Sequence, residues 1–247
     1  MAPLSERGQD SGDTRRMKAI AVVCGALAFA AGSLMTPGFD GFDPAAFPNP
    51  VENLPLTPAG YAFSIWGVIF IGLILNAFYG LIKRDTDAGW DRARWPLFVT
   101  QAIGAAWIGI AQLSPVMATI TIWIMLAGAL LALRAALRTP ETWWMHVPIA
   151  LLAGWLTAAS WVALTTIFVG YTALSPAFGS WIGLAGALAT SLAVLRAMPQ
   201  AGYGVAVIWA LVGVMVSTLS GGLPFLIATG AGIVVVAGMS LIALRRV

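Results

Sequence analysis

Few residues in this 247-residue chain could carry covalent chemistry. The sequence has one cysteine, Cys24, and one histidine, His146. A single cysteine cannot form an internal disulfide, nor can it supply a cysteine-based zinc or iron–sulfur site. No HExxH motif is present, and Ser64 and Ser160, which lie in apolar stretches, have no His or Lys within plausible reach. The sequence therefore predicts a protein that is not an enzyme and holds no metal.

The amide side chains inside apolar stretches are the second group that could act on a small molecule. They are Asn76, Gln101 and Gln112. Gln101 and Gln112 are eleven residues apart, or three helical turns, and would share one helix face. Two interpretations stand: hydrogen bonds between helices, each worth about 0.6–2 kcal/mol, or a polar track for a ligand. No charged residue lies deep in an apolar stretch, which disfavours ion-driven antiport.

The composition indicates that lipid is the solvent for most of the chain. Hydrophobic residues make up 60% of the sequence and charged residues only 9%, whereas a water-facing surface needs about 25–35% charged side chains. A bilayer core about 30 Å thick requires roughly 20 apolar residues per helix. The sequence predicts an all-α integral membrane protein with about eight transmembrane helices, near residues 17–35, 58–82, 96–113, 115–137, 145–168, 178–197, 203–220 and 223–244.

The cations give the orientation, because Lys and Arg next to membrane spans stay in the cytoplasm. With eight crossings, all 13 Lys and Arg residues fall on one side of the membrane. Both termini are therefore predicted to be cytoplasmic, and an all-helical protein of this kind favours a bacterial inner membrane. The net charge of +3 follows from this distribution and does not indicate a nucleic-acid partner.

Two segments outside the predicted helices have more than one interpretation. Residues 1–16 have the composition of a disordered cytoplasmic tail. The first apolar run is either a permanent helix, in which Cys24 is a small buried residue, or a cleaved export signal ending near Ala28-Phe29-Ala30. The external loop 36–57 holds five prolines and three acidic residues, and it is either a lid over a site or a connector.

The eleven tryptophans fall into groups by depth. Those expected at the cytoplasmic interface are Trp90, Trp95, Trp143 and Trp144, and His146 beside them is expected to be an interfacial anchor rather than a proton carrier.

A second group lies deeper in the membrane. Trp66, Trp107, Trp123 and Trp161 each lie about seven residues from the outer end of a helix, roughly 10 Å deep. Such a layer is either a flat-walled apolar pocket or ordinary packing and lipid contact. Trp155 and Trp161 are six residues apart, about 240° around a helix, so both cannot face one cavity.

Several segments resemble the TspO/MBR family, also called tryptophan-rich sensory proteins or translocator proteins. The stretch from Thr57 to Phe70 is similar to the start of the family's second helix, Gln101 with Trp107 to its third, and Trp155-Leu-Thr157-Ala-Ala159 to its fifth. The resemblance covers residues 17–168, a five-helix region that includes the long outer loop. The chain departs from the family pattern at Gly104 or Ala105 and at Ala163, where helical Asn residues are expected.

The rest of the chain, residues 169–247, adds three predicted helices to the five-helix family core. They are either a lateral partner domain or a replacement for a homodimer contact, and a homodimer is a candidate assembly.

The resemblance implies a membrane-embedded binder of planar hydrophobic ligands, porphyrin, haem or sterol-like lipid, with a transport or sensory role. No cofactor is required, and porphyrin or haem would be a ligand. The candidate site residues are Tyr61, Phe63, Trp66, Phe70, Trp107, Trp123 and Trp161.

The alternative is a facilitative carrier for a small neutral metabolite or drug, with Asn76, Gln101 and Gln112 as its polar track. A third, weaker interpretation is a scaffold protein without a ligand.

Overall fold

The computed structural model describes residues 4–35, 41–219 and 222–244, and no strand occurs in these ranges. The helices are α1 (Leu4–Met35), α2 (Ile65–Lys83), α3 (Ala88–Leu113), α4 (Pro115–Ala136), α5 (Val147–Tyr171), α6 (Pro176–Ala197), α7 (Ala201–Ser217) and α8 (Leu223–Leu244). Two 3-10 turns, η1 (Pro44–Ala46) and η2 (Gly60–Ser64), precede α2, and a π-helical turn, η3 (Thr142–His146), precedes α5.

Each of the eight predicted segments corresponds to one helix. Seven helical segments of the described chain are long and apolar enough to cross a membrane. The eighth helix, α7, has 17 residues, which gives about 26 Å at 1.5 Å per residue and approaches the thickness of a bilayer core. The prediction of an all-α membrane protein with eight helices is confirmed.

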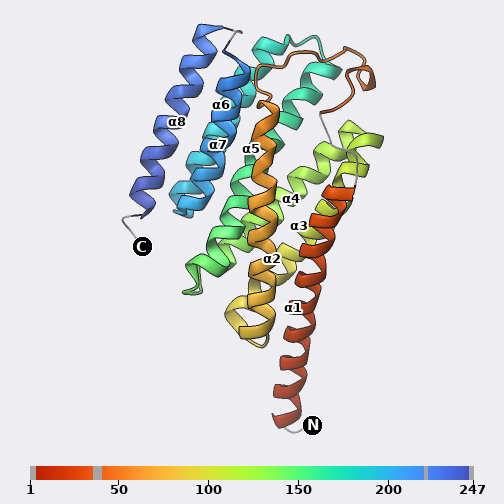
Figure 1. Cartoon of the computed structure of the whole chain (residues 1–247), viewed down its shortest axis with the longest axis vertical. Coiled ribbons are helices and arrows are strands. Elements are labelled where there is room, and N and C mark those ends of the chain that lie inside the picture. Colours follow the sequence, from red (N-terminus) through yellow and green to blue (C-terminus); the bar gives the residue numbers. More distant parts are fainter. Residues whose placement is uncertain (1–3, 36–40, 220–221, 245–247) are drawn as a thin grey trace.

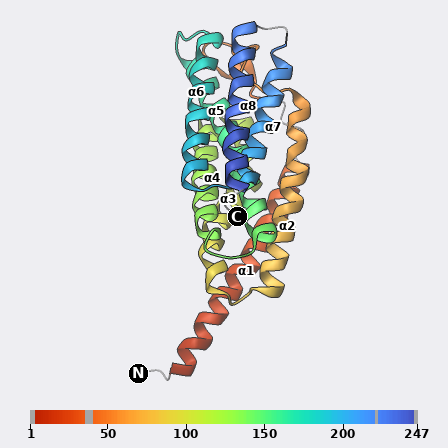
Figure 2. The same ribbon diagram turned by 90° about the vertical axis from the view of Figure 1, so that its left-hand side faces the viewer.

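The first five helices form a closed ring. Around it, α1 contacts α2 and α3, α3 contacts α4, α4 contacts α5, and α5 returns to α2. The remaining helices pack outside the ring on α5, which touches both α6 and α7, while α8 covers α6 and α7 (Figures 1 and 2). The fold is therefore a five-helix bundle with three additional helices, and α5 is shared by both parts.

Glycines allow the backbones of neighbouring helices to approach closely. A Cβ atom added at Gly154 of α5 would lie 2.3 Å from the carbonyl oxygen of Tyr203 on α7. One added at Gly32 of α1 would lie 2.2 Å from the carbonyl oxygen of Ala105 on α3. Because lipid provides no hydrophobic driving force between helices, such close contact supplies much of the packing energy.

The first helix begins earlier than the sequence predicts. Residues 4–16, predicted to be part of a disordered tail, form the first turns of α1, which project beyond the bundle (Figure 1). Extending a formed helix fixes one residue per hydrogen bond gained and so costs little. The extension is also held by contacts to the α2–α3 turn, since the Arg15 guanidinium donates to the Thr86 carbonyl at 3.1 Å. Residues 1–3 of the predicted tail lie outside the described residues.

The buried Arg94 of α3 fastens the cytoplasmic end of the ring. Its guanidinium donates to the carbonyl oxygens of Arg15 at 2.8 Å and Asp85 at 2.7 Å, and to those of Arg84 at 2.5 Å and Gly80 at 3.4 Å. Carbonyls at the end of α2 lack partners within their own helix. One cation therefore joins α1 and α3 to the last turn of α2.

The ends of the bundle differ in charge. The α2–α3 and α4–α5 turns lie at the end where α1 begins and α8 ends, opposite residues 41–59 (Figure 1). Cations at this end pair with nearby acids: Lys18 with Asp91 at 2.9 Å, and Arg84 with Glu141 at 2.7 Å. This common location agrees with the predicted cytoplasmic side.

Candidate ligand site at an aromatic cluster

Five aromatic side chains meet where α1, α2 and α5 contact one another and the η2 turn. The rings of Trp66 and Phe70 are stacked, with centroids 5.3 Å apart and planes at 17°. Phe29 of α1 meets both edge-on, at 5.5 Å and 5.1 Å. Trp155 of α5 packs edge-on against Trp66 at 6.2 Å and against Phe63 of η2 at 5.7 Å. We call these residues the aromatic cluster.

Local sequence explains how the aromatic cluster forms. Trp66 and Phe70 are four residues apart on α2, so they lie one above the other on one face. Phe29 fits because its neighbour on α3 is Gly104, where an added Cβ would lie 2.5 Å from the Phe29 ring. Phe29 and Trp155 are each only 2% exposed. The base of the aromatic cluster is therefore a rigid, closely packed apolar surface.

The η2 turn carries the exposed aromatic residues of the site. Tyr61 and Phe63 are 45% and 38% exposed. Tyr61 packs edge-on against Trp209 of α7 at 5.8 Å, and the Trp209 indole donates to the Ala62 carbonyl at 2.7 Å. The Ala59 amide also donates to the Gly213 carbonyl of α7 at 3.0 Å. Helix α7 thus positions the turn that leads into α2.

The described part of the long outer loop is bound to the ends of α5 and α6. The Asn49 side chain donates to the Thr172 carbonyl at 2.9 Å, and the Leu56 amide donates to the Ser180 hydroxyl at 3.3 Å. Phe47 is buried and meets Tyr171 edge-on at 5.8 Å. The loop therefore reaches across to the additional helices, while residues 36–40 lie outside the described residues.

The other predicted tryptophans face different neighbours. The Trp107 indole donates to the Ala118 carbonyl at 3.0 Å, across the α3–α4 turn. Trp123 and Trp161 meet edge-on at 5.5 Å between α4 and α5, and the Trp161 indole donates to the Thr190 hydroxyl of α6 at 3.1 Å. The structure thus brings together Phe63, Trp66 and Phe70, and it pairs Trp123 of α4 with Trp161 of α5 outside the aromatic cluster.

The three amides do not form one continuous track. Asn76 is buried, and its side chain donates to the Trp144 carbonyl at 2.7 Å. Gln101 is fully buried between α1 and α3, and neither amide atom has a hydrogen-bond partner in the described protein. Gln112 is exposed near the end of α3. Two of the three therefore lie inside the bundle and the third on its surface.

Phe29 and Trp155 are site residues that sequence reasoning missed. Phe29 lies six residues before the outer end of α1 at Met35. The tryptophans were selected by their depth of about seven residues from the outer end of a helix, and the same criterion would have selected Phe29 if phenylalanines had been included. Trp155 lies about 9 Å nearer the cytoplasm than Trp161, so the depth criterion left it out, and its place in the aromatic cluster depends on which helix packs against which face of α5.

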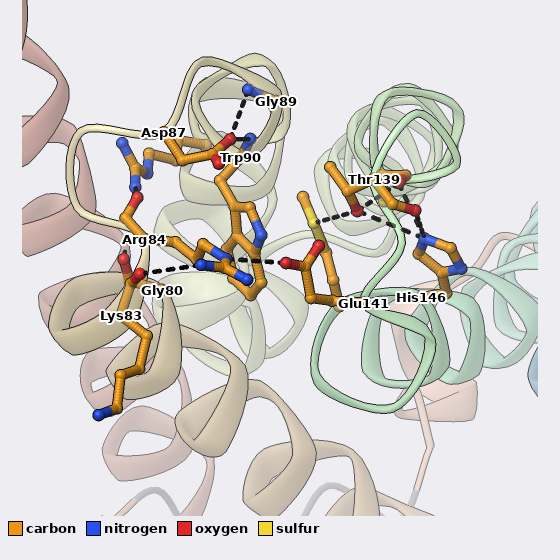
Figure 3. Close-up of polar contacts among 12 residues, drawn as sticks. Gly80, Lys83, Arg84, Asp87, Gly89, Trp90, Thr139, Glu141 and His146 are labelled. Carbon is orange, nitrogen blue, oxygen red and sulfur yellow. Dashed lines mark hydrogen bonds and ion pairs between the residues drawn. The ribbon is translucent and has the colours of Figure 1, made fainter.

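The cytoplasmic end carries a network of polar contacts (Figure 3). The Asp87 carboxylate accepts from the amides of Gly89 at 2.7 Å and Trp90 at 3.0 Å and so caps α3. Glu141, which accepts from Arg84 at 2.7 Å, raises the pKa of that guanidinium through the hydrogen bond and the opposite charge. These contacts connect the starts of α3 and α5 to the end of α2.

His146 belongs to this network rather than to the interface with lipid. It is buried, and its Nε2 lies 2.9 Å from the carbonyl oxygens of Ala136 and Thr139. Since carbonyls only accept, Nε2 must carry the proton. The prediction that His146 is an interfacial anchor is therefore wrong. The π turn directs His146 inward, where it caps the end of α4. No cluster of three or more His, Cys, Asp or Glu residues suited to a metal occurs among the described residues.

Comparison with known proteins identifies the family of this chain. The sequence model of the family described as TSPO-like protein matches residues 19–243. The chain belongs to the TSPO-like protein family. No curated protein and no solved structure matches the chain.

The TSPO-like match extends from the ring through α8. It therefore includes the additional helices as well as residues 19–168, and the division of the chain near residue 168 stays a prediction. At Gly104, one of the two positions where the TspO/MBR pattern suggests a helical Asn, this chain leaves room for the Phe29 ring.

Proposed function

We propose that this TSPO-like membrane protein binds planar hydrophobic ligands, porphyrin, haem or a sterol-like lipid, at the aromatic cluster. The observation that carries the proposal is the stacked pair Trp66 and Phe70, with Phe29 and Trp155 packed edge-on beside it. Flat π surfaces of this kind favour flat apolar partners. The output of binding is transport or a sensory signal, and no covalent chemistry is involved.

The exposed aromatics of η2 would form the outer wall of this site. Tyr61 and Phe63 lie above the buried base and present ring surface that the protein does not cover. A ligand entering here would bury both rings, and any apolar ring area that it removes from water would contribute about 25 cal/mol per Å². Trp107, Trp123 and Trp161, which pack against other neighbours, would act on binding only through the positions of α3, α4 and α5.

The test is a fluorescence titration of the purified protein with protoporphyrin and with haem, read as tryptophan quenching. Trp66→Ala removes half of the stacked pair and should weaken saturable binding at least tenfold. Trp181→Ala is the matched control, because Trp181 lies on α6 and contacts Phe225 of α8. Linear quenching in the wild type, or equal affinity in wild type and Trp66→Ala, would contradict the proposal. Protein-free micelles correct for ligand partitioning.

The remaining properties that we propose for this protein follow from its class, a TSPO-like membrane protein. It would reside in a bacterial inner membrane with both termini in the cytoplasm, in contact with lipid, and would require neither a cofactor nor a nucleic-acid partner. A homodimer is the candidate assembly. The five-helix region would hold the ligand, and the three additional helices would support the η2 turn and the outer loop.

A second candidate function is facilitated transport of a small neutral solute. The observation that favours it is the fully buried Gln101 amide without a protein partner, because buried polar groups normally have one. Swelling of proteoliposomes in glycerol or urea measures such flux. The carrier hypothesis predicts faster swelling than in protein-free vesicles and its loss in Gln101→Leu, with Gln112→Leu on the surface as the control. Equal swelling with and without protein would exclude it for these solutes.

A further inference from the structure

The aromatic cluster lies far from the cations of the chain. No Lys or Arg occurs in residues 19–82, 95–133, 139–195 or 197–244, and these ranges contain every member of the cluster. On α2, Lys83 is thirteen residues beyond Phe70, which is about 20 Å along the helix. The single histidine, His146, lies at the cytoplasmic end, where its Nε2 is bonded to backbone carbonyls. A negative charge on a ligand at the cluster would therefore have no basic side chain beside it.

The described part of the outer loop brings acidic side chains to the end of the bundle opposite the cations. Asp43 and Glu52 are both exposed, and the Asp43 carboxylate accepts from the Ala45 amide at 2.9 Å. Acidic side chains at one end of a protein make the local potential more negative, which opposes the approach of an anion. The outer end of the bundle therefore favours uncharged ligands over anionic ones.

The start of α2 does not compensate for these acids. A helix N-terminus carries a partial positive charge and unpaired amides, which together can bind an anion. Here the η2 turn precedes the helix and takes up amides at this point. The Ile65 amide donates to the Ala62 carbonyl, and the Ala62 amide donates to the Ala59 carbonyl at 2.9 Å. These two amides are already bonded and are not free to hold a carboxylate.

The exposed polar group that the candidate site itself offers is a neutral hydroxyl. Tyr61 is 45% exposed, and its ring packs edge-on against Trp209 of α7. A phenol hydroxyl can donate or accept a hydrogen bond. It therefore suits a hydroxyl group on a ligand, but it cannot neutralise a carboxylate.

We infer that the aromatic cluster selects uncharged planar ligands, such as a sterol-like lipid with a hydroxyl group, over ligands of similar flatness that carry carboxylates. Protoporphyrin and haem both carry carboxylates, so each binds more weakly than an uncharged analogue of the same ring. The physical reason is that an ionised group without a partner is costly in an apolar environment. The inference rests on the proposed function and adds to it the charge of the preferred ligand.

The test compares protoporphyrin with its dimethyl ester, which has the same flat ring but no carboxylate. Both compounds are titrated at neutral pH into the purified protein in a non-ionic detergent, and tryptophan quenching is measured. The ester should bind at least about tenfold more tightly than the diacid, because an ionised carboxylate loses solvation without gaining a cation. Protein-free micelles correct for the stronger partitioning of the ester into detergent.

An added charge at the η2 turn separates electrostatics from hydrophobicity. Ser64 is exposed and directly follows Phe63, so Ser64→Lys brings an ammonium group to the turn, and Ser64→Gln is the uncharged control with a long side chain. The diacid should bind Ser64→Lys about threefold more tightly than Ser64→Gln, as an exposed ion pair would give. The ester should bind the two variants equally. Gln112→Lys adds the same charge at the exposed outer end of α3 and should not strengthen binding of the diacid.

The outcomes separate this inference from the proposed function. If the diacid binds as tightly as the ester, and Trp66→Ala weakens both, the site is supported but its charge selectivity is overturned. Equal binding of the diacid to Ser64→Lys and Ser64→Gln also overturns the inference. If neither compound quenches saturably, or if Trp66→Ala binds both as tightly as the wild type, the proposed function fails and the inference fails with it.

Discussion

The indole N–H of Trp209 donates a 2.7 Å hydrogen bond to the backbone carbonyl of Ala62, a residue 147 positions earlier in the chain. Trp209 lies on α7, outside the five-helix ring, and Ala62 lies in the η2 turn that leads into α2. Tyr61 packs edge-on against the same indole at 5.8 Å. The geometry of the aromatic cluster therefore depends on a helix that the five-helix region does not contain.

Removing this hydrogen bond should loosen the η2 turn. Trp209→Phe keeps most of the ring contact with Tyr61 but deletes the donor to Ala62. The net loss of one hydrogen bond is about 1 kcal/mol, or roughly fivefold in an equilibrium constant. Hydrogen exchange at residues 60–66 should accelerate by this factor, and protoporphyrin affinity should fall by a similar amount.

Trp181→Phe is the control for this prediction. Trp181 lies on α6 and meets Phe225 at 5.2 Å, so its replacement should leave exchange at residues 60–66 unchanged. If Trp209→Phe and Trp181→Phe give the same exchange rates in this segment, the link between α7 and the η2 turn is not what holds the turn.

The closest approach of α5 and α7 should be sensitive to a single methyl group. Gly154→Ala places a Cβ 2.3 Å from the Tyr203 carbonyl oxygen, and the helices must separate to admit it. Overpacking of this kind costs about 1–3 kcal/mol. The separation would also stretch the 2.8 Å hydrogen bond between the hydroxyls of Thr157 and Tyr203. Thermal unfolding in detergent should show a lowered midpoint.

A glycine without close neighbours serves as the reference for that substitution. Gly238 of α8 has no atom within 4 Å of an added Cβ, and Gly238→Ala should be neutral or stabilise by up to about 1 kcal/mol. Equal midpoints for the Gly154→Ala and Gly238→Ala variants would show that α5 and α7 are not tightly packed.

Loss of Arg94 should destabilise the cytoplasmic end of the ring. In Arg94→Gln, most of the carbonyls of Gly80, Arg84, Asp85 and Arg15 lose their donor. Hydrogen bonds from a charged donor contribute about 1.5–3 kcal/mol each, so the free energy of unfolding should fall by about 3 kcal/mol or more. Arg94→Lys should retain only part of the free energy of unfolding that Arg94→Gln loses, because an ammonium cannot reproduce the planar fork of a guanidinium.

The neighbouring Arg92 provides the comparison for Arg94. Arg92 is exposed on the same helix, and Arg92→Gln should change the free energy of unfolding by no more than about 0.5 kcal/mol. If both glutamine variants unfold at the same denaturant concentration, the carbonyl contacts of Arg94 contribute nothing measurable to stability.

The eight helices could be predicted from sequence because the bilayer sets their length, and the same sequence predicts which end is cytoplasmic. Helix length follows from the thickness of the hydrocarbon core, and cations mark the cytoplasmic ends. Neither rule gives the rotation of a helix about its axis. Cys24 was expected to be buried, yet it is exposed on the lipid-facing side of α1 between the better covered Val23 and Gly25.

The candidate site was harder to predict for the same reason. Trp155 and Trp161 lie on one helix about 9 Å apart in depth, and Trp155 contacts Trp66 of the ring whereas Trp161 contacts Thr190 of α6. The choice depends on α6 packing against the outside of α5, a contact between helices that periodicity within one helix does not reveal. Trp66 with Phe70 was predictable because their spacing of four residues places them together whatever the rotation.

The orientation can be tested with single cysteines. Cys24, the one cysteine of the chain, is replaced by Ser, and either Glu52 of the outer loop or Lys83 at the end of α2 is changed to Cys. Both side chains are exposed at opposite ends of the bundle. A membrane-impermeant maleimide needs a thiolate in water, so in right-side-out vesicles it should label Glu52→Cys and leave Lys83→Cys unlabelled. Inverted vesicles should give the reverse pattern, and labelling of Lys83→Cys in intact right-side-out vesicles would invert the topology.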